Sequence, residues 1–166
     1  MDQQDLKKAA EWIVHSSHNT GFTGAGISVE SGIPPFRGEN GLWNKYDPGI
    51  LDLDYFYSHP EEAWRVIKEI FYDFFGSAEP NAGHKAMAKM QQMGLMDTII
   101  TQNIDMLHHR AGSRNVVMIG DQLATDIAGA NAAGIDSALI TGGVATASIP
   151  AGGPQPTWLL PPLGDA

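Results

Sequence analysis

The stretch QNIDMLHHRAGSRNVVMIGDQLATDIAGAN, from Gln102 to Asn131, decides the fold. It follows one short apolar run, DTIIT at 97–101, and contains a second, NVVMIGD at 115–121. Short apolar runs that end in polar residues or glycine are typical of buried strands in a parallel sheet. The small-residue segment ATDIAGANAAG at 124–134 then predicts a helix that ends at Gly134. The stretch therefore predicts strands that alternate with helices.

The rest of the chain continues this alternation. Helical spacing of apolar residues predicts helices at 3–16, 59–75 and 79–94. Further strands are predicted before the Gly-rich turn of HNTGFTGAGIS (18–28), at 136–143, and at 157–163, where prolines favour an edge position. The Gly- and Pro-rich segment 32–49 predicts a long irregular loop. We expect an α/β fold, a three-layer Rossmann-like arrangement with a mainly parallel sheet of four or five strands and helices on both faces.

Composition limits the possible partners and the compartment. The 166 residues suit one domain, and a net charge of -9 argues against nucleic acid and anionic membranes as partners. The absence of cysteine excludes disulfides and cysteine-ligated zinc. No apolar run is long enough to span a bilayer and no signal peptide is recognised, so we expect a cytoplasmic protein, as in recombinant expression.

The turn Gly24-Ala25-Gly26 follows the first predicted strand and precedes a helix start. Small residues at such a turn let backbone N–H groups approach a phosphate, and the helix dipole favours the anion. A plain packing turn explains the same residues equally well. The polar Gln102, Asn103 and Asp105 follow another strand, at the edge where open α/β sheets bind ligands.

Four segments in order resemble the sirtuins, the NAD-dependent protein deacylases: TGAGISVESGIPPFRG (23–38), GLWNKYDP (41–48), AEPNAGHKAMAKM (78–90) and TQNIDMLHHRAGS (101–113). The resemblance covers about residues 3–115. It implies a large Rossmann-like domain with a small zinc-binding domain inserted. It further implies contacts of the turn at Gly24, with Ala25, Gly26 and Ser28, along the NAD phosphates and ribose. By the same resemblance Phe36 and Arg37 lie over the nicotinamide-side ribose and phosphate, and Gln102, Asn103 and Asp105 bound the nicotinamide pocket.

One departure from this family concerns the general base. The resemblance implies a histidine at the end of the strand after Ser113, but Gly120 stands at about that place. A missing general base commonly slows a reaction by about 10²–10⁴. His108 and His109 are interpreted as solvated or packing residues, and no catalytic residue is assigned.

The segment VVMIGDQLATDIAGANAAGIDSALITGGVA (116–145) resembles the C-terminal part of the haloacid dehalogenase-like hydrolases, over about residues 115–164. That resemblance implies a Mg²⁺ site at Asp121 and Asp126, since hard cations prefer carboxylate oxygens. Asp126 could equally be an early helix residue that complements the helix dipole. Asp52 and Asp54 have the spacing of the family's nucleophile motif but lack its context.

These two resemblances lead to a hypothesis of a single chimeric domain over 1–166, joined near Arg114–Val116 and engineered or recombined. We expect a folded scaffold that retains at most weak NAD or ADP-ribose binding and weak Mg²⁺ binding, with no zinc and no native catalytic activity. The alternatives are a weakened sirtuin-like deacylase or NAD hydrolase, and a Mg²⁺-dependent phosphatase-like hydrolase. Exposed apolar side chains on the 59–75 helix, such as Trp64, would allow a homodimer.

Overall fold

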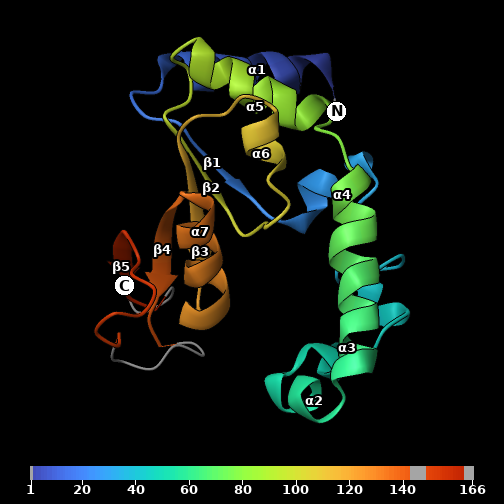
Figure 1. Cartoon of the computed structure of the whole chain (residues 1–166). Helices are drawn as coiled ribbons and strands as arrows, with labels where there is room; N and C mark the ends of the chain where they lie inside the picture. Colours follow the sequence, from blue (N-terminus) through green and yellow to red (C-terminus); the bar gives the residue numbers. More distant parts are fainter. Residues whose placement is uncertain (1, 143–148, 163–166) are drawn as a thin grey trace.

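Five parallel strands form one sheet in the computed structural model, which describes residues 2–142 and 149–162 (Figure 1). The strands lie in chain order: β1 (Thr20–Thr23), β2 (Thr98–Thr101), β3 (Val116–Gly120), β4 (Asp136–Ile140) and β5 (Trp158–Leu160). The predicted parallel α/β sheet is confirmed, and β5, which Pro161 and Pro162 follow directly, is an edge strand as predicted. Residues 143 and 163, at the ends of two predicted strands, lie outside the described residues.

Three helices pack on one face of this sheet: α5 (Ala82–Gln92), α6 (Leu107–Arg110) and α7 (Ala128–Ala133). Right-handed crossovers between neighbouring strands that advance in one direction place their helices on the same face. Gly21 of β1 makes room for α5, because a Cβ there would collide with Met87 Cε. On the opposite face Phe22 is 58% exposed, beside an apolar cluster of Val117, Ile119 and Ala138.

A helical arm stands beside the sheet and is made of the residues between β1 and α5 (Figure 1). It begins with the 3₁₀ helix η1 (Ala25–Ser31) and continues through a loop that contains two further short 3₁₀ helices. The predicted 59–75 helix is divided into three consecutive pieces, of which the middle one is π-helical. The pieces of the arm are η2 (Leu42–Asn44), η3 (Pro48–Leu51), α2 (Leu53–Ser58), α3 (Pro60–Ile67), η4 (Lys68–Phe74) and α4 (Phe75–Ser77).

Two apolar clusters hold the arm together and attach it to the sheet. Leu42, Val66 and Ile70 form the core of the arm itself. Ile33 and Ala78 pack with Leu107, which belongs to α6 and is fully buried. The second cluster fixes the arm against the carboxyl ends of the strands, the edge at which open α/β sheets bind their ligands.

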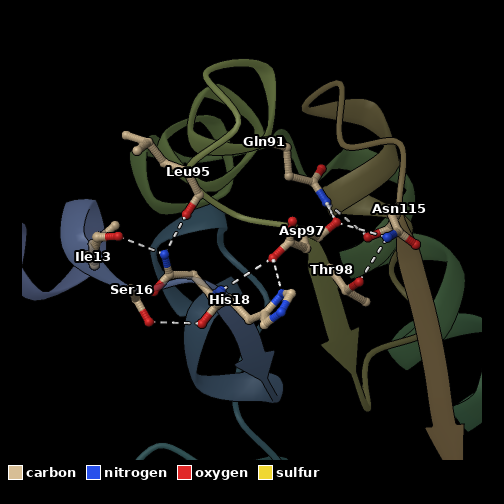
Figure 2. A network of polar contacts seen from close by, with 9 residues as sticks. Ile13, Ser16, His18, Gln91, Leu95, Asp97, Thr98 and Asn115 are labelled. Atoms are coloured by element: carbon tan, nitrogen blue, oxygen red, sulfur yellow. Dashed lines mark hydrogen bonds and ion pairs between the residues drawn. The ribbon is translucent and has the colours of Figure 1, made fainter.

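The amino ends of β1, β2 and β3 are joined by polar contacts (Figure 2). Asn115 Nδ2 donates to the Asp97 carbonyl and to Thr98 Oγ1, both at 2.8 Å. Gln91 of α5 donates to the Asn115 carbonyl at 2.9 Å. Asn19 Nδ2 donates to the carbonyls of Ile13 at 2.8 Å and Leu95 at 2.9 Å, which ties the end of α1 (Gln3–His15) to the entry of β2. In the described residues no helix is long and apolar enough to cross a membrane.

Replacing Asn19 by alanine should weaken the attachment of α1. The Asn19→Ala variant loses two side-chain hydrogen bonds at a half-buried site, so its free energy of unfolding should fall by about 2 kcal/mol. Urea denaturation followed by circular dichroism measures this. Asn40→Ala in the exposed part of the arm loop is the matched control and should change stability by less than about 0.5 kcal/mol. Equal stabilities of the two variants would contradict the role of Asn19.

Candidate functional site

A buried carboxylate lies where the ends of β1 and β2 meet. Asp105 Oδ2 accepts a 2.6 Å hydrogen bond from Ser28 Oγ, and its Oδ1 accepts one of 2.9 Å from the Leu107 backbone N–H. Ser28 is fully buried in η1, and Asp105 is only 9% exposed. A buried carboxylate needs such donors to offset its lost hydration. These bonds therefore fix η1 and α6 relative to the strand ends.

Asn103 completes this polar group. Its Nδ2 donates to the Gly24 carbonyl at 3.0 Å and to Ser28 Oγ at 3.3 Å. Its backbone N–H donates to Thr101 Oγ1 at 3.1 Å, which holds the residue at the end of β2. The Gly24 turn and the Asn103–Asp105 segment, predicted separately from the sequence, are thus brought into direct contact.

Asn81, which the sequence reasoning did not select, anchors η1 from the opposite side. Its Nδ2 donates to the Ile27 carbonyl at 2.7 Å and to Ser31 Oγ at 3.0 Å. Its Oδ1 accepts from the N–H groups of Gly83 and His84, so it also caps α5. The N-cap position of an asparagine before a helix could have been read from the sequence, whereas its contact with η1 spans 54 residues and could not.

The loop that holds Phe36 and Arg37 is folded back on itself. The Phe36 ring lies 5.3 Å from the Trp43 ring, and the Trp43 N–H donates to the Phe36 carbonyl at 3.1 Å. Gly41 is required at this crossing, since a Cβ there would lie 2.7 Å from the backbone carbon of Arg37. Asn44 Nδ2 donates to the carbonyls of Gly38 and Glu39, which closes the loop.

A cavity of about 360 Å³ opens between this loop, the arm and the strand ends. It brings together six of the predicted residues: Ala25, Ser28, Phe36, Gln102, Asn103 and Asp105. Gly24, Gly26 and Arg37 do not line it. Its apolar walls, which sequence reasoning missed, come mainly from the arm and comprise Ile33, Pro34, Leu51, Phe71, Phe75 and Ile104.

Asp126 fills the space above the end of β3. Its Oδ2 accepts from the backbone N–H groups of Asp121 at 3.0 Å and Gln122 at 3.1 Å, so the carboxylate closes the turn into the helix η5 (Leu123–Ile127). In the parts of the chain that the structure describes, no group of three or more His, Asp or Glu side chains is placed to hold a metal ion. The expected Mg²⁺ site at Asp121 and Asp126 therefore gains no support. The closing of the turn gives Asp126 a structural role, as the helix-dipole alternative had suggested.

Two histidines are buried behind the polar group. His84 and His108 are 0% and 2% exposed, their rings lie 4.9 Å apart, and His108 Nε2 pairs with Thr23 Oγ1 at 2.9 Å. Burial, together with the neighbouring His84, lowers the pKa of His108 from 6.5 to about 4 against the opposing charge of Asp105. Burial also lowers the pKa of His84. His108 is therefore a neutral packing residue at pH 7, which is one of the two roles that the sequence allowed it.

A model of the Sir2 family matches residues 24–128, which include all of the polar residues around Asp105. The chain belongs to the Sir2 family. A curated Sir2 relative, NAD-dependent protein deacylase 2 of Archaeoglobus fulgidus, is 50% identical over 116 residues, which are 69% of this chain and 45% of the relative. NAD-dependent protein deacetylase of Thermotoga maritima is 46% identical over 112 residues, 68% of this chain and 45% of its own length. The chain thus spans a little under half the length of these relatives.

Solved Sir2 structures agree in fold. A structure titled Structural Basis for the Mechanism and Regulation of Sir2 Enzymes has a TM-score of 0.64 and 48% identity over 74% of this chain and 48% of that one. A complex of a mutant Sir2 homologue with ADP ribose has a TM-score of 0.63 and 42% identity over 74% of this chain and 48% of that one. The Rossmann-like α/β fold is confirmed by these neighbours.

Two predictions are corrected by these comparisons. The hypothesis of an engineered, inactive chimeric scaffold is wrong as the main account of this chain, because the matching relatives are NAD-dependent protein deacylases and deacetylases. The Sir2 match also continues to residue 128, past the junction predicted near Arg114–Val116. The hydrolase-like origin of residues 115–164 has no support among the matches. The Gly-Asp-x-x-x-x-Asp pattern that suggested it is explained by Asp126 closing its own turn.

His108 should make stability depend on pH. On unfolding, its pKa returns from about 4 to 6.5, so between these values the unfolded chain binds the extra proton. The contribution of His108 to the free energy of unfolding has its full value above pH 6.5. It falls by about 3 kcal/mol as the pH decreases toward 4. The His108→Gln variant can still bond to Thr23 but does not titrate, so its free energy of unfolding should vary less over this range in urea melts. An unchanged pH dependence would contradict the assignment.

Gly120 should tolerate no side chain. A Cβ at this position would collide with Asp126 Oδ2, an atom already held by two backbone N–H groups. Gly120→Ala should therefore lower the free energy of unfolding by about 2 kcal/mol or more. Gly76→Ala is the control, because its Cβ would meet nothing within 4 Å and it lies in α4. Equal urea midpoints for the two variants would refute the close approach at Gly120.

Proposed function

We propose that this chain binds NAD at the cavity beside Asp105 and belongs to an NAD-dependent protein deacylase. The observation that supports the proposal most is that the buried Ser28 and Asp105 and the half-buried Asn103 are joined by hydrogen bonds and line one cavity. A volume of about 360 Å³ suits the nicotinamide and ribose end of the dinucleotide. The curated relatives that match the chain are named as NAD-dependent enzymes.

The site offers different chemistry at its two ends. At the apolar end, the half-buried Phe71 and Phe75 and the exposed Ile104 offer apolar contact to a ring the size of nicotinamide. At the polar end, Asp105 supplies a fixed negative charge, which favours breaking the bond between nicotinamide and ribose because positive charge develops on the sugar. Gly24 and Gly26 let the backbone approach the phosphates, and Arg37 supplies a cationic fork for them.

A second candidate reaction, slow hydrolysis of NAD, is favoured by Gly120. The strand end to which the family resemblance assigns the general base has no side chain here, and Asp126 occupies the space above it. Acyl transfer needs a proton acceptor at the ribose, whereas loss of nicotinamide to water depends more on the binding and charge of the cavity. The two reactions therefore place different demands on the same residues.

NAD binding should depend on Arg37. In isothermal titration calorimetry, Arg37→Ala should raise the dissociation constant for NAD about tenfold through the loss of a charge-assisted phosphate contact. Lys45→Ala is the matched control, since Lys45 is a cation of the same loop region whose ammonium is paired with Glu69 at 2.6 Å. Equal effects of the two variants, or no saturable heat at millimolar NAD, would contradict the proposed site.

Turnover should be measured separately from binding. The chain is incubated with NAD, with and without an acetyl-lysine peptide, and the products are identified by mass spectrometry. Peptide-dependent O-acetyl-ADP-ribose supports the deacylase, and ADP-ribose without peptide supports the hydrolase. Intact NAD in both reactions, under conditions where calorimetry shows binding, would contradict catalysis by this chain while leaving the binding site intact.

A further inference from the structure

Two histidine rings are buried beside the candidate site, and each has one ring nitrogen without a partner. His84 in α5 and His108 in α6 are 0% and 2% exposed. Within residues 2–142 and 149–162, His84 Nε2 and His108 Nδ1 are buried and make no hydrogen bond. Buried polar atoms are nearly always hydrogen-bonded, so these two require an explanation. The two rings lie 4.9 Å apart, so a single explanation can serve both.

The hydrogen bonds of His84 show which of its ring nitrogens carries the proton. Burial lowers the pKa of both rings, so each is neutral at pH 7. A neutral imidazole has one nitrogen that donates and one that accepts. His84 Nδ1 accepts from the backbone N–H of Asn81 at 3.4 Å, in the capping box of α5. The proton of His84 is therefore on Nε2, and this buried N–H needs an acceptor.

The unpartnered nitrogen of His108 is the acceptor that His84 needs. If His108 carried its proton on Nδ1, a second buried donor would stand beside the first, and neither could accept from the other. If the proton is on Nε2, His108 Nδ1 can accept from His84, directly or through one buried water. The position of a histidine proton is set by the hydrogen bond at the other ring nitrogen. The two rings together therefore favour a proton on Nε2 of His108.

From His108 a series of hydrogen bonds continues to the candidate site. His108 Nε2 lies 2.9 Å from Thr23 Oγ1, and Thr23 Oγ1 donates to Thr101 Oγ1 at 2.9 Å. The backbone N–H of Asn103 donates to the same Thr101 Oγ1 at 3.1 Å. Thr23 and Thr101 are 8% and 5% exposed, so bulk water has little access to these bonds. A proton on His108 Nε2 completes the series, because the Thr23 hydroxyl then accepts from the ring while it donates to Thr101.

We propose that His108, with its proton on Nε2, is a positioning residue that acts on the NAD site through Thr23 and Thr101. It fixes the hydroxyl group that holds the Asn103 N–H at the end of β2. The side chain of Asn103 in turn donates to the Gly24 carbonyl, so the turn after β1 depends on the same series. This role rests on the proposed function, and it extends the site to buried residues that do not line the cavity of about 360 Å³.

The position of the ring protons is tested first, in the parent chain. Heteronuclear NMR of isotope-labelled histidine side chains distinguishes a protonated from an unprotonated ring nitrogen. His84 and His108 should both carry the proton on Nε2 at pH 7. A proton on Nδ1 of His108 would overturn the proposal. This measurement uses no NAD, so its result is independent of the proposed function.

Amide hydrogen exchange tests the connection to Asn103. His108→Leu and Thr23→Val each interrupt the series and should speed exchange of the Asn103 amide about tenfold. His108→Gln can still donate to Thr23 and should exchange as the parent chain does. The Ile99 amide of β2, which donates to the Asn115 carbonyl at 2.9 Å, is the internal control and should not change. Equal acceleration at Asn103 and Ile99 would indicate general destabilisation and would refute a specific role of His108.

Calorimetry with NAD connects the same variants to the site. His108→Leu and Thr23→Val should raise the dissociation constant severalfold and His108→Gln should not, once circular dichroism has established that all three are folded. Unchanged affinity in both interrupted variants would overturn the positioning role. Absence of saturable binding in the parent chain would instead contradict the proposed NAD site, and the exchange at Asn103 would still test the hydrogen-bond series.

Discussion

The hydrogen bonds of Asp105 are the constraint on which the candidate site depends. A carboxylate that is 9% exposed requires donors, and it obtains them from the Ser28 hydroxyl and the Leu107 N–H. These two donors belong to different elements, one after β1 and one after β2. The hydrogen bonds to this one buried carboxylate therefore hold η1, α6 and the ends of β1 and β2 together. The polar side of the cavity is consequently held by the folded chain itself.

The arm forms the other side of the cavity, and apolar contacts hold this side in place. Phe75 packs on the cluster of Ile33, Ala78 and Leu107, and Phe71, whose ring lies 5.3 Å from that of Phe75, lines the cavity beside it. Apolar contact is non-directional, so this wall can move without breaking a specific hydrogen bond. One rigid polar wall and one apolar wall suit a ligand with a polar ribose and a flat ring. The same division explains why Asn81, which reaches η1 with two hydrogen bonds, belongs to the rigid side.

The sequence predicts the strands and puts Asn103 and Asp105 directly after one of them, but it predicts little of the cavity's walls. Runs such as DTIIT indicate a buried strand locally, and Asn103 and Asp105 follow at its end. The contact of Asn81 with Ile27 and the position of Phe71 and Phe75 depend on how the arm folds back, which no local pattern encodes. The predicted Mg²⁺ site at Asp121 and Asp126 gains no support for a related reason. A carboxylate that follows a strand-to-helix turn can bind a cation or close the turn, and the backbone geometry decides between them.

One buried polar group holds together the separate segments of the chain that form the candidate site. The most direct test is to map ADP-ribose binding by backbone amide chemical shifts of the isotope-labelled chain. Shifts should be concentrated at 24–28, 36–37 and 102–105, and all three segments should follow one saturable curve. Shifts confined to other regions, or none at millimolar ADP-ribose, would contradict it.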